Sequence, residues 1–439
     1  MKKKVITITK IIILIISLTN NILFAQQIEV SGKNYKLTKI AINHFLTQKY
    51  EEKIIAKEIR DTVCKNLSDS GIFSIVAENN FIEQNKGSEF IPFFEAWKKI
   101  NATILVNGSL TKNRKNNYTI VISIWDNILA KKILHRKITF SEKSIQKTSH
   151  IISDHIYQEI IGEKGYFDSK ILYVAEKVIE NKIFTRIAMM NQDGKEHKYL
   201  TNGKFISISP KISPDKENIA YVDFRAGISK IFLRNLYSGQ ENLLTNMKGS
   251  IFSPRFSRNG KKILFSLAKK GATNIFKFDI NTKKISVLTR NIYINTSPQF
   301  SPDDKKIIFT SNRLGTAKIY TMNEEGKNVV KITEKPGSHL EPKWSPDGKY
   351  ISYINLRRKL GYYINIINTK TGEETTVVKS DVIHGYCWCP NSKYILFSEA
   401  IGNKEEEKKT IYKLQKINIF NKHKTTINTP YSASDPIWY

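Results

Sequence analysis

Hydrophobic positions in the first part of the chain repeat with two different periods. Alternating positions predict strands at 36–42, 102–108 and 118–126. Apolar side chains three or four positions apart predict helices at 51–67, 94–99 and 145–161. Gly162 is a natural end for the last helix. The mixture predicts an α/β or α+β domain over residues 26–162, followed by a linker over 163–169.

The second half of the chain repeats one unit every 44 residues. Segments 297–309 and 341–353 share a proline, an aromatic residue and a Ser-Pro-Asp turn. The first proline of successive units gives the period at Pro210, Pro254, Pro298 and Pro342. Another step of 44 reaches Tyr386, where a degenerate copy begins. A period near 44 with four short strands per unit is typical of β-propeller blades.

The number of second strands predicts the number of blades. Six copies begin at Ile171, Ile219, Ile263, Ile307, Ile351 and Ile395. The first copy has no proline-marked strand before it, whereas the final segment 435–439 has no strands after it. We therefore predict an all-β six-bladed propeller over 170–439, in which the C-terminal strand completes the first blade and leaves no open sheet edge. Deletion of the last five residues should destabilise the whole propeller.

The residue types that could support catalysis or bind a metal have simpler structural explanations. The aspartates of the repeated turn, such as Asp347 in Pro346-Asp347-Gly348, suit a tight reversal better than a catalytic role. The eight histidines are scattered and form no metal-binding pair. Cys64, Cys387 and Cys389 are too few for a disulfide framework and are interpreted as structural thiols. The sequence therefore predicts no cofactor, no metal site and no catalytic residue.

The first 25 residues have the order of a secretory signal peptide. Basic residues from Lys2 to Lys10 precede an apolar run from Ile11 to Leu18. The alternative is an uncleaved anchor, but a bilayer requires about 20 apolar residues and this run is shorter. We predict cleavage after Ala25 and a periplasmic protein that does not span the membrane.

Charge and composition narrow the class of partner. The chain is 40% hydrophobic and 25% charged, with a formal net charge of +30. That charge would suit nucleic acid, but Lys and Arg are spread along the chain, without a basic helix, a zinc-ligand spacing or an aromatic RNA-binding strand. The sequence thus favours acidic partners or an anionic setting, and no nucleic acid.

Several segments resemble the TolB family. They are Phe94–Ser109, Ile152–Gly165, the junction Phe167–Val174 and the closing Asp-Pro-Ile-Trp at 435–438. Two features depart from the family pattern: Cys389-Pro-Asn-Ser392 replaces a turn motif, and 404–409 is a charged insertion. The resemblance implies a non-enzymatic scaffold of the Tol-Pal system that supports outer-membrane integrity and invagination during cell division.

The resemblance also implies two protein partners. The propeller mouth would bind the lipoprotein Pal, and the segment after the signal peptide would bind TolA. On this chain the TolA-binding residues are Gln26, Gln27, Ile28, Glu29 and Val30. Ile28 and Val30 share one face of an extended segment, which could add to a partner's sheet edge. Other outer-membrane lipoproteins or peptidoglycan-associated proteins are further expected partners, with the chain a monomer inside a multiprotein complex.

Blade geometry predicts which residues form the Pal-binding rim. Loops that enter the innermost strands emerge on the same face as loops that join the second and third strands. The entering loops supply Ser250, Asn295, Thr296, Ser338, His339 and His384. The other loops supply four cations, each 44 residues from the next: Arg225, Lys269, Arg313 and Arg357. We expect this arc to steer an acidic partner surface.

Two other functions are compatible with a propeller. A serine peptidase of the prolyl-oligopeptidase type would need a G-x-S-x-G elbow, which the sequence lacks. The alternative is a periplasmic propeller that binds a small ligand, sugar or peptidoglycan, possibly as a sialidase-like or lyase-like enzyme. Such an enzyme would need carboxylates or histidines around the central channel. The innermost strands offer mostly Pro, Phe, Trp and Ser, which disfavours an enzyme.

Overall fold

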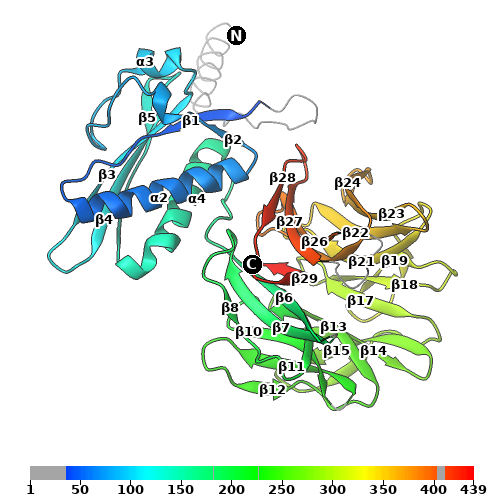
Figure 1. Cartoon of the computed structure of the whole chain (residues 1–439). Helices are drawn as coiled ribbons and strands as arrows, with labels where there is room; N and C mark the ends of the chain where they lie inside the picture. Colours follow the sequence, from blue (N-terminus) through cyan, green and yellow to red (C-terminus); the bar gives the residue numbers. More distant parts are fainter. Residues whose placement is uncertain (1–35, 181, 226, 403–410) are drawn as a thin grey trace, which may run out of the picture.

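A small α/β domain and a six-bladed β-propeller make up the part of the chain that the computed structural model describes, residues 36–180, 182–225, 227–402 and 411–439 (Figure 1). The first domain has a five-stranded sheet in the order β2-β1-β3-β4-β5. Its strands are β1 (Thr38–Ile42), β2 (Phe73–Ile75), β3 (Ile104–Lys112), β4 (Tyr118–Asp126) and β5 (Lys131–Phe140). Its helices are α2 (Tyr50–Asp69), α3 (Phe94–Lys99) and α4 (Ile145–Ile161), with 3₁₀ turns at Glu78–Asn80 and Glu142–Ser144.

The apolar stripes of the helices bury against opposite faces of this sheet. Ile59 and Val63 of α2 pack with Ile152 of α4 and Ile40 of β1 in one cluster. The neighbouring Ala41 points the other way, and α3 covers that face with Trp97. The side chain of Glu52 accepts hydrogen bonds from the backbone N–H groups of Gln48 and Lys49 and so caps the start of α2. The predicted helices are confirmed.

Two strands of this domain were not predicted. β2 has only three residues, too few for a period to be recognised. β5 lies at the sheet edge and pairs only with β4, so Lys131, Lys132 and Lys137 remain partly or fully exposed along it. An edge strand rich in lysine lacks the hydrophobic alternation of a half-buried strand, although such charges are a common protection against edge-to-edge association.

The propeller contains six four-stranded antiparallel blades. Blade one is β29 (Ser432–Trp438), β6 (Lys170–Ile179), β7 (Lys182–Asn191) and β8 (Lys198–Tyr199); blade two is β9 (Ile206–Ile212), β10 (Asn218–Arg225), β11 (Ile228–Asn235) and β12 (Glu241–Leu243). Blade three is β13 (Ser250–Phe256), β14 (Lys262–Lys269), β15 (Ala272–Asp279) and β16 (Ile285–Val287); blade four is β17 (Asn295–Phe300), β18 (Lys306–Ser311), β19 (Lys318–Asn323) and β20 (Val330–Lys331). Blade five is β21 (Ser338–Trp344), β22 (Tyr350–Arg357), β23 (Gly361–Asn368) and β24 (Glu374–Ser380); blade six is β25 (Ile383–Trp388), β26 (Tyr394–Ile401), β27 (Ile411–Asn418) and β28 (Lys424–Ile427).

The C-terminal strand closes the ring, as predicted. β29 pairs antiparallel with β6, with Ile437 opposite Leu172 and Trp438 opposite Ile171. The Trp438 indole donates a hydrogen bond to the Ser169 hydroxyl over 2.7 Å. The first blade is thus assembled from the two ends of the repeat region.

Each innermost strand carries a β-bulge at the same place. The pairing register shifts once between the first and second strands of every blade. The residue at the bulge has positive φ in all six blades: Ser209, Ser253, Ser297, Glu341, Gly385 and Asp435. A proline follows it in five of them, and a bulge is one of the few places in a sheet that accept proline. Gly385 is required in blade six because a Cβ there would lie 2.8 Å from an Asp435 carboxylate oxygen.

The repeated aspartates form turns, as predicted. Asp347 accepts hydrogen bonds from the Ser345 hydroxyl over 2.6 Å and from the Lys349 backbone N–H over 3.1 Å. Asp303 makes the same pair of contacts with Ser301 and Lys305. Both carboxylates are therefore bonded within their own turns.

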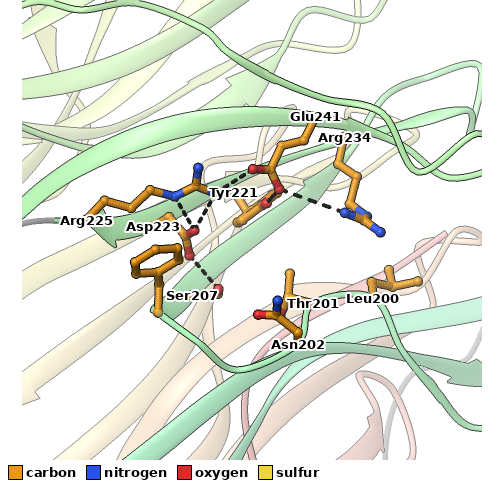
Figure 2. Close-up of a pocket in the computed structure, with 10 residues that line it drawn as sticks. Leu200, Thr201, Asn202, Ser207, Tyr221, Asp223, Arg225, Arg234 and Glu241 are labelled. Carbon is orange, nitrogen blue, oxygen red and sulfur yellow. Dashed lines mark hydrogen bonds and ion pairs between the residues drawn. The ribbon is translucent and has the colours of Figure 1, made fainter.

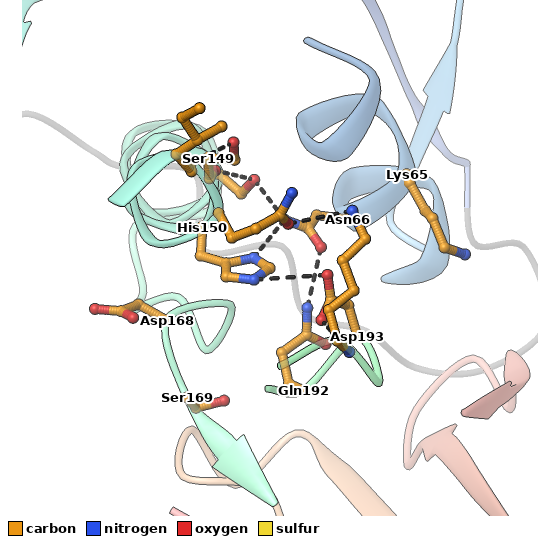
Figure 3. A network of polar contacts seen from close by, with 12 residues as sticks. Lys65, Asn66, Ser149, His150, Asp168, Ser169, Gln192 and Asp193 are labelled. Atoms are coloured by element: carbon orange, nitrogen blue, oxygen red, sulfur yellow. Dashed lines mark hydrogen bonds and ion pairs between the residues drawn. The ribbon is translucent and has the colours of Figure 1, made fainter. Parts of the chain in front are cut away.

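The two domains meet through a buried polar network (Figure 3). The Asn66 amide on α2 lies 3.0 Å from His150 Nδ1 on α4, and its oxygen accepts a hydrogen bond from Gln192, between β7 and β8. His150 Nε2 lies 3.6 Å from Asp193. Gly71 has φ +68° and abuts the His423 ring of blade six, so that a Cβ there would collide with the ring. His150 is thus a buried residue of the domain boundary.

Truncation of Trp438 tests the closure of the ring. The side chain is 5% exposed and packs in the cluster that joins the two domains. We expect Trp438→Ala to lower the free energy of unfolding by about 3–5 kcal/mol in urea titrations. Tyr237→Ala, at an 82% exposed position, is the control and should change little. Equal effects of the two changes would contradict the proposed importance of closure.

Candidate functional site

The propeller has two rims that differ in what they contact. The front rim is formed by the loops that enter the innermost strands and by the hairpins that join second and third strands. The back rim is formed by the turns that join first to second strands and third to fourth strands. The hydrogen bonds that join described residues of 36–162 to the propeller include those from Tyr394 to the Ser70 carbonyl oxygen and from Asn421 to the Gly71 carbonyl oxygen, both at the back rim. The described N-terminal domain therefore leaves the front rim free.

The entering loops bring the predicted residues to the front rim with different exposure. Ser250 and His384 are exposed, and Thr296 and Ser338 are half-buried. Asn295 and His339 are completely buried. The side chains of Ser250, Thr296, Ser338 and His384 can therefore contact a partner. The prediction that Asn295 and His339 do so as well is corrected, because both are buried.

Asn295 and His339 hold their loops from inside. Asn295 donates to the Thr273 carbonyl oxygen and to Asn291, and accepts from Arg313. The His339 ring packs on Tyr353 with centroids 4.6 Å apart, and its Nδ1 lies 2.7 Å from the Thr333 hydroxyl. Burial lowers the pKa of His339 to about 4, with a smaller effect from Lys318. Sequence position alone could not distinguish a loop residue that faces the protein interior from one that faces the solvent.

Arg225 lies at the front rim but is neutralised (Figure 2). Its guanidinium donates to Asp223 over 2.9 Å and to Glu241 over 2.5 Å. It also stacks 3.6 Å from the centroid of Phe232. Two carboxylates therefore compensate this cation, which removes it from the steering arc.

The other three cations are not paired with a described carboxylate. Lys269 is exposed at the end of β14, and Arg357 is half-buried at the end of β22. Arg313 follows β18 and stacks on Tyr320, with its guanidinium 4.7 Å from the ring centroid. Arg357 stacks similarly on Tyr363 at 5.0 Å. These residues form a cationic arc over blades three to five.

Large apolar side chains lie beside these cations and were not predicted. Leu314 follows Arg313 and is 69% exposed, and Leu360 lies three residues after Arg357 and is 58% exposed. Ile292, in the loop that enters blade four, is also exposed. Exposed apolar side chains next to arginine are typical of protein interfaces. The sequence feature that could have revealed them is the presence of single leucines within otherwise polar hairpins.

A cavity of about 340 Å³ lies between blades one and two (Figure 2). Thr201 and Asn202 line it from blade one, and Tyr221, Arg234 and Glu241 line it from blade two. Tyr221 donates a hydrogen bond to Glu241, and Ser207 donates to Asp223 over 2.5 Å. The polar groups of its wall are thus bonded chiefly to one another.

The central channel is charged, contrary to the prediction that Pro, Phe, Trp and Ser dominate it. Lys211, Arg255, Glu341, Lys343 and Asp435 line a small cavity between the six innermost strands. The prediction was wrong because these residues flank the prolines that drew attention to the strands. Within the described ranges no group of three or more His, Cys, Asp or Glu residues could hold a metal ion.

Comparison with known proteins identifies the family. A model of the TolB beta propeller domain matches residues 157–439, and one of the TolB amino-terminal domain matches residues 26–133. The chain belongs to the TolB family. The first match alone covers more than half of the sequence, so the resemblance noted in the sequence is confirmed.

Relatives named "Tol-Pal system protein TolB" support this membership. One from Orientia tsutsugamushi strain Boryong is 37% identical over 222 residues, which are 51% of this chain and 49% of the relative. One from Rickettsia felis is 34% identical over 206 residues, 47% of this chain and 46% of the relative. The matches thus span about half the length of these relatives.

A solved TolB structure shares the fold. The crystal structure of TolB from Acinetobacter baumannii matches with a TM-score of 0.82 at 23% identity, covering 92% of this chain and 96% of that one. The six-bladed propeller with an N-terminal α/β domain is therefore the architecture of a TolB protein.

Three predicted features lie outside the described residues. They are the signal peptide with Ala25 followed by the TolA-binding residues 26–30, and the charged insertion at 404–409. Within the described part of the chain, no helix has the length and apolar character required to cross a bilayer.

The buried His339 predicts a pH dependence of stability. In the unfolded chain His339 takes up a proton near its ordinary pKa of 6.5. In the folded protein the same side chain, with its pKa lowered to about 4, takes up a proton only near pH 4. The unfolded state therefore binds more protons in this window, and stability falls as the pH falls from about 6.5 to about 4.

We expect His339→Gln to reduce the loss of unfolding free energy between about pH 6.5 and about pH 4.5 by about 2 kcal/mol. Urea titrations at both pH values measure it. The exposed His384→Gln is the control and should leave the loss unchanged. The assignment fails if the wild type and His339→Gln lose the same amount.

Proposed function

We propose that this chain is a periplasmic, non-catalytic scaffold of the Tol-Pal system that binds Pal through the front rim and TolA through residues 26–30. In this role it supports outer-membrane integrity and invagination during division. Family membership and the names of the relatives support a Tol-Pal role. The single structural observation that carries the docking proposal is the free front rim, which combines cations with exposed apolar side chains.

The composition of the front rim suits a protein partner with an acidic surface. Lys269, Arg313 and Arg357 stand at equivalent places on three consecutive blades, so their fields add along one arc. Leu314 and Leu360 supply apolar area beside them. Since exposed charges act mainly on association, the cations would set the rate and its salt dependence, while the apolar contacts would set the lifetime of the complex.

The TolA proposal rests on the family resemblance and on the pattern of residues 26–30. Ile28 and Val30 would lie on one face of an extended segment, with Gln27 and Glu29 on the other. An extended segment can pair through its backbone with the open edge of a partner sheet, while one row of side chains packs on that sheet.

Charge reversal at the front rim tests the Pal proposal. We expect the triple variant Lys269→Glu, Arg313→Glu and Arg357→Glu to associate with the soluble Pal domain at least about tenfold more slowly at low salt, and with a weaker dependence on salt. Stopped-flow or surface-binding kinetics at several ionic strengths measure both.

The back rim offers a matched control. Lys261, Lys305 and Lys349 are exposed and are likewise spaced by 44 residues, in the turns between first and second strands. Their reversal to Glu makes the same change in net charge and should alter the rate much less. Similar effects of both triples would attribute the result to net charge and remove the front rim from the proposal.

Substitutions in the N-terminal segment test the TolA proposal separately. We expect Ile28→Asp with Val30→Asp to weaken calorimetric binding to soluble TolA at least about tenfold, because a carboxylate would be buried against the partner sheet. Gln27→Asp, on the opposite face, should have little effect. If the double variant binds TolA as the wild type does, this segment is not the binding strand.

A further inference from the structure

The residues that line the channel come from equivalent positions on the six innermost strands. The bulge residues form a first ring, and the residues two positions further on form a second ring. The second ring comprises Lys211, Arg255, Gln299, Lys343, Cys387 and Ile437, of which Lys211, Arg255 and Lys343 line the cavity. Three of its six members are cations, on blades two, three and five. The first ring adds two carboxylates, Glu341 and Asp435.

The two carboxylates already have partners. Glu341 lies 3.1 Å from the Lys343 ammonium. Asp435 accepts hydrogen bonds from the backbone N–H and the hydroxyl of Ser209, over 3.2 and 3.3 Å. Three cations against two carboxylates leave the channel with an excess positive charge.

Arg255 and Lys211 have no such partner. The Arg255 guanidinium donates to the carbonyl oxygen of Pro254, and the Lys211 ammonium donates to that of Pro210. No carboxylate oxygen of a described residue lies within 4.0 Å of either group. Lys211 is only 8% exposed. Both cations therefore retain N–H donors without a carboxylate in direct contact, in a partly enclosed space.

An unpaired cation in such a space is unfavourable. Removing it from water is costly unless an opposite charge compensates it. A metal cation would add to the excess charge, whereas an anion would neutralise it. The hydroxyls of Ser253 and Ser297, which line the same cavity and belong to adjacent blades, add neutral donors suited to an oxyanion.

We propose that the channel binds one small oxyanion through Arg255 and Lys211, with Ser253 and Ser297 as further donors. The planar guanidinium presents paired N–H groups that match a carboxylate or phosphate. The cavity of about 50 Å³ suits phosphate or a short carboxylate better than a nucleotide or an oligosaccharide. The four proposed donors are not among the front-rim residues proposed to bind Pal, and the site is expected to be occupied without any protein partner.

Calorimetric titration of the full chain with inorganic phosphate and with acetate, at constant ionic strength in chloride, tests the proposal. We expect saturable binding with one site per chain for at least one of them; the stronger ligand distinguishes a phosphate site from a carboxylate site. Arg255→Gln should weaken binding at least tenfold. Gln already occupies the equivalent position at Gln299, so the strand accepts this side chain.

Two further variants make the result specific. Glu341→Gln removes a negative charge from the same cavity and should tighten binding severalfold. Arg258→Gln removes an exposed arginine in the turn after β13 and should leave binding unchanged. Absence of saturable binding to both the wild type and Glu341→Gln would overturn the proposal. Equal weakening by Arg255→Gln and Arg258→Gln would overturn it as well.

Discussion

The antiparallel pairing of β29 with β6 is the contact on which the rest of the propeller depends. Each blade buries apolar side chains against the next, as Leu264 of blade three does in the cluster that includes Phe309 of blade four. Such a row of blades has two open ends unless the last meets the first. Placing one strand from the end of the repeat beside three from its beginning makes the ring continuous and covers both ends.

Closure of the ring also imposes the form of the innermost strands. Six strands converge on one axis, where side chains have little room, and each strand bends there through a bulge. Proline fixes the backbone at the bulge without losing a ladder hydrogen bond. The same bend turns the residues on either side toward the axis, so the device that shapes the strand also places charges in the channel.

This geometry explains which features could be predicted from the sequence. The period of 44 residues specifies blade number and closure because each copy repeats the same turn chemistry. The bounds of α3, β4 and α4 agree with the prediction, because their hydrophobic patterns either extend over many residues or end at a clear change in residue type. Burial of His339 depends on the neighbouring strand that supplies Tyr353, and neutralisation of Arg225 depends on Glu241, sixteen residues away. Contacts of this kind arise from folding and carry no local signature.

Ring closure and domain docking share the same side chains. Trp438 of the closing strand packs edge-on against Tyr166, with ring centroids 5.4 Å apart, and Tyr166 in turn contacts Tyr394 of blade six and Tyr157 of α4. One cluster therefore contains the last strand of the propeller, the connection between the domains and a helix of the N-terminal domain. Because interiors are closely packed, a shift of β29 relative to β6 would have to move Tyr166 and hence α4. The position of the N-terminal domain on the back rim is thus fixed by the same contacts that close the ring.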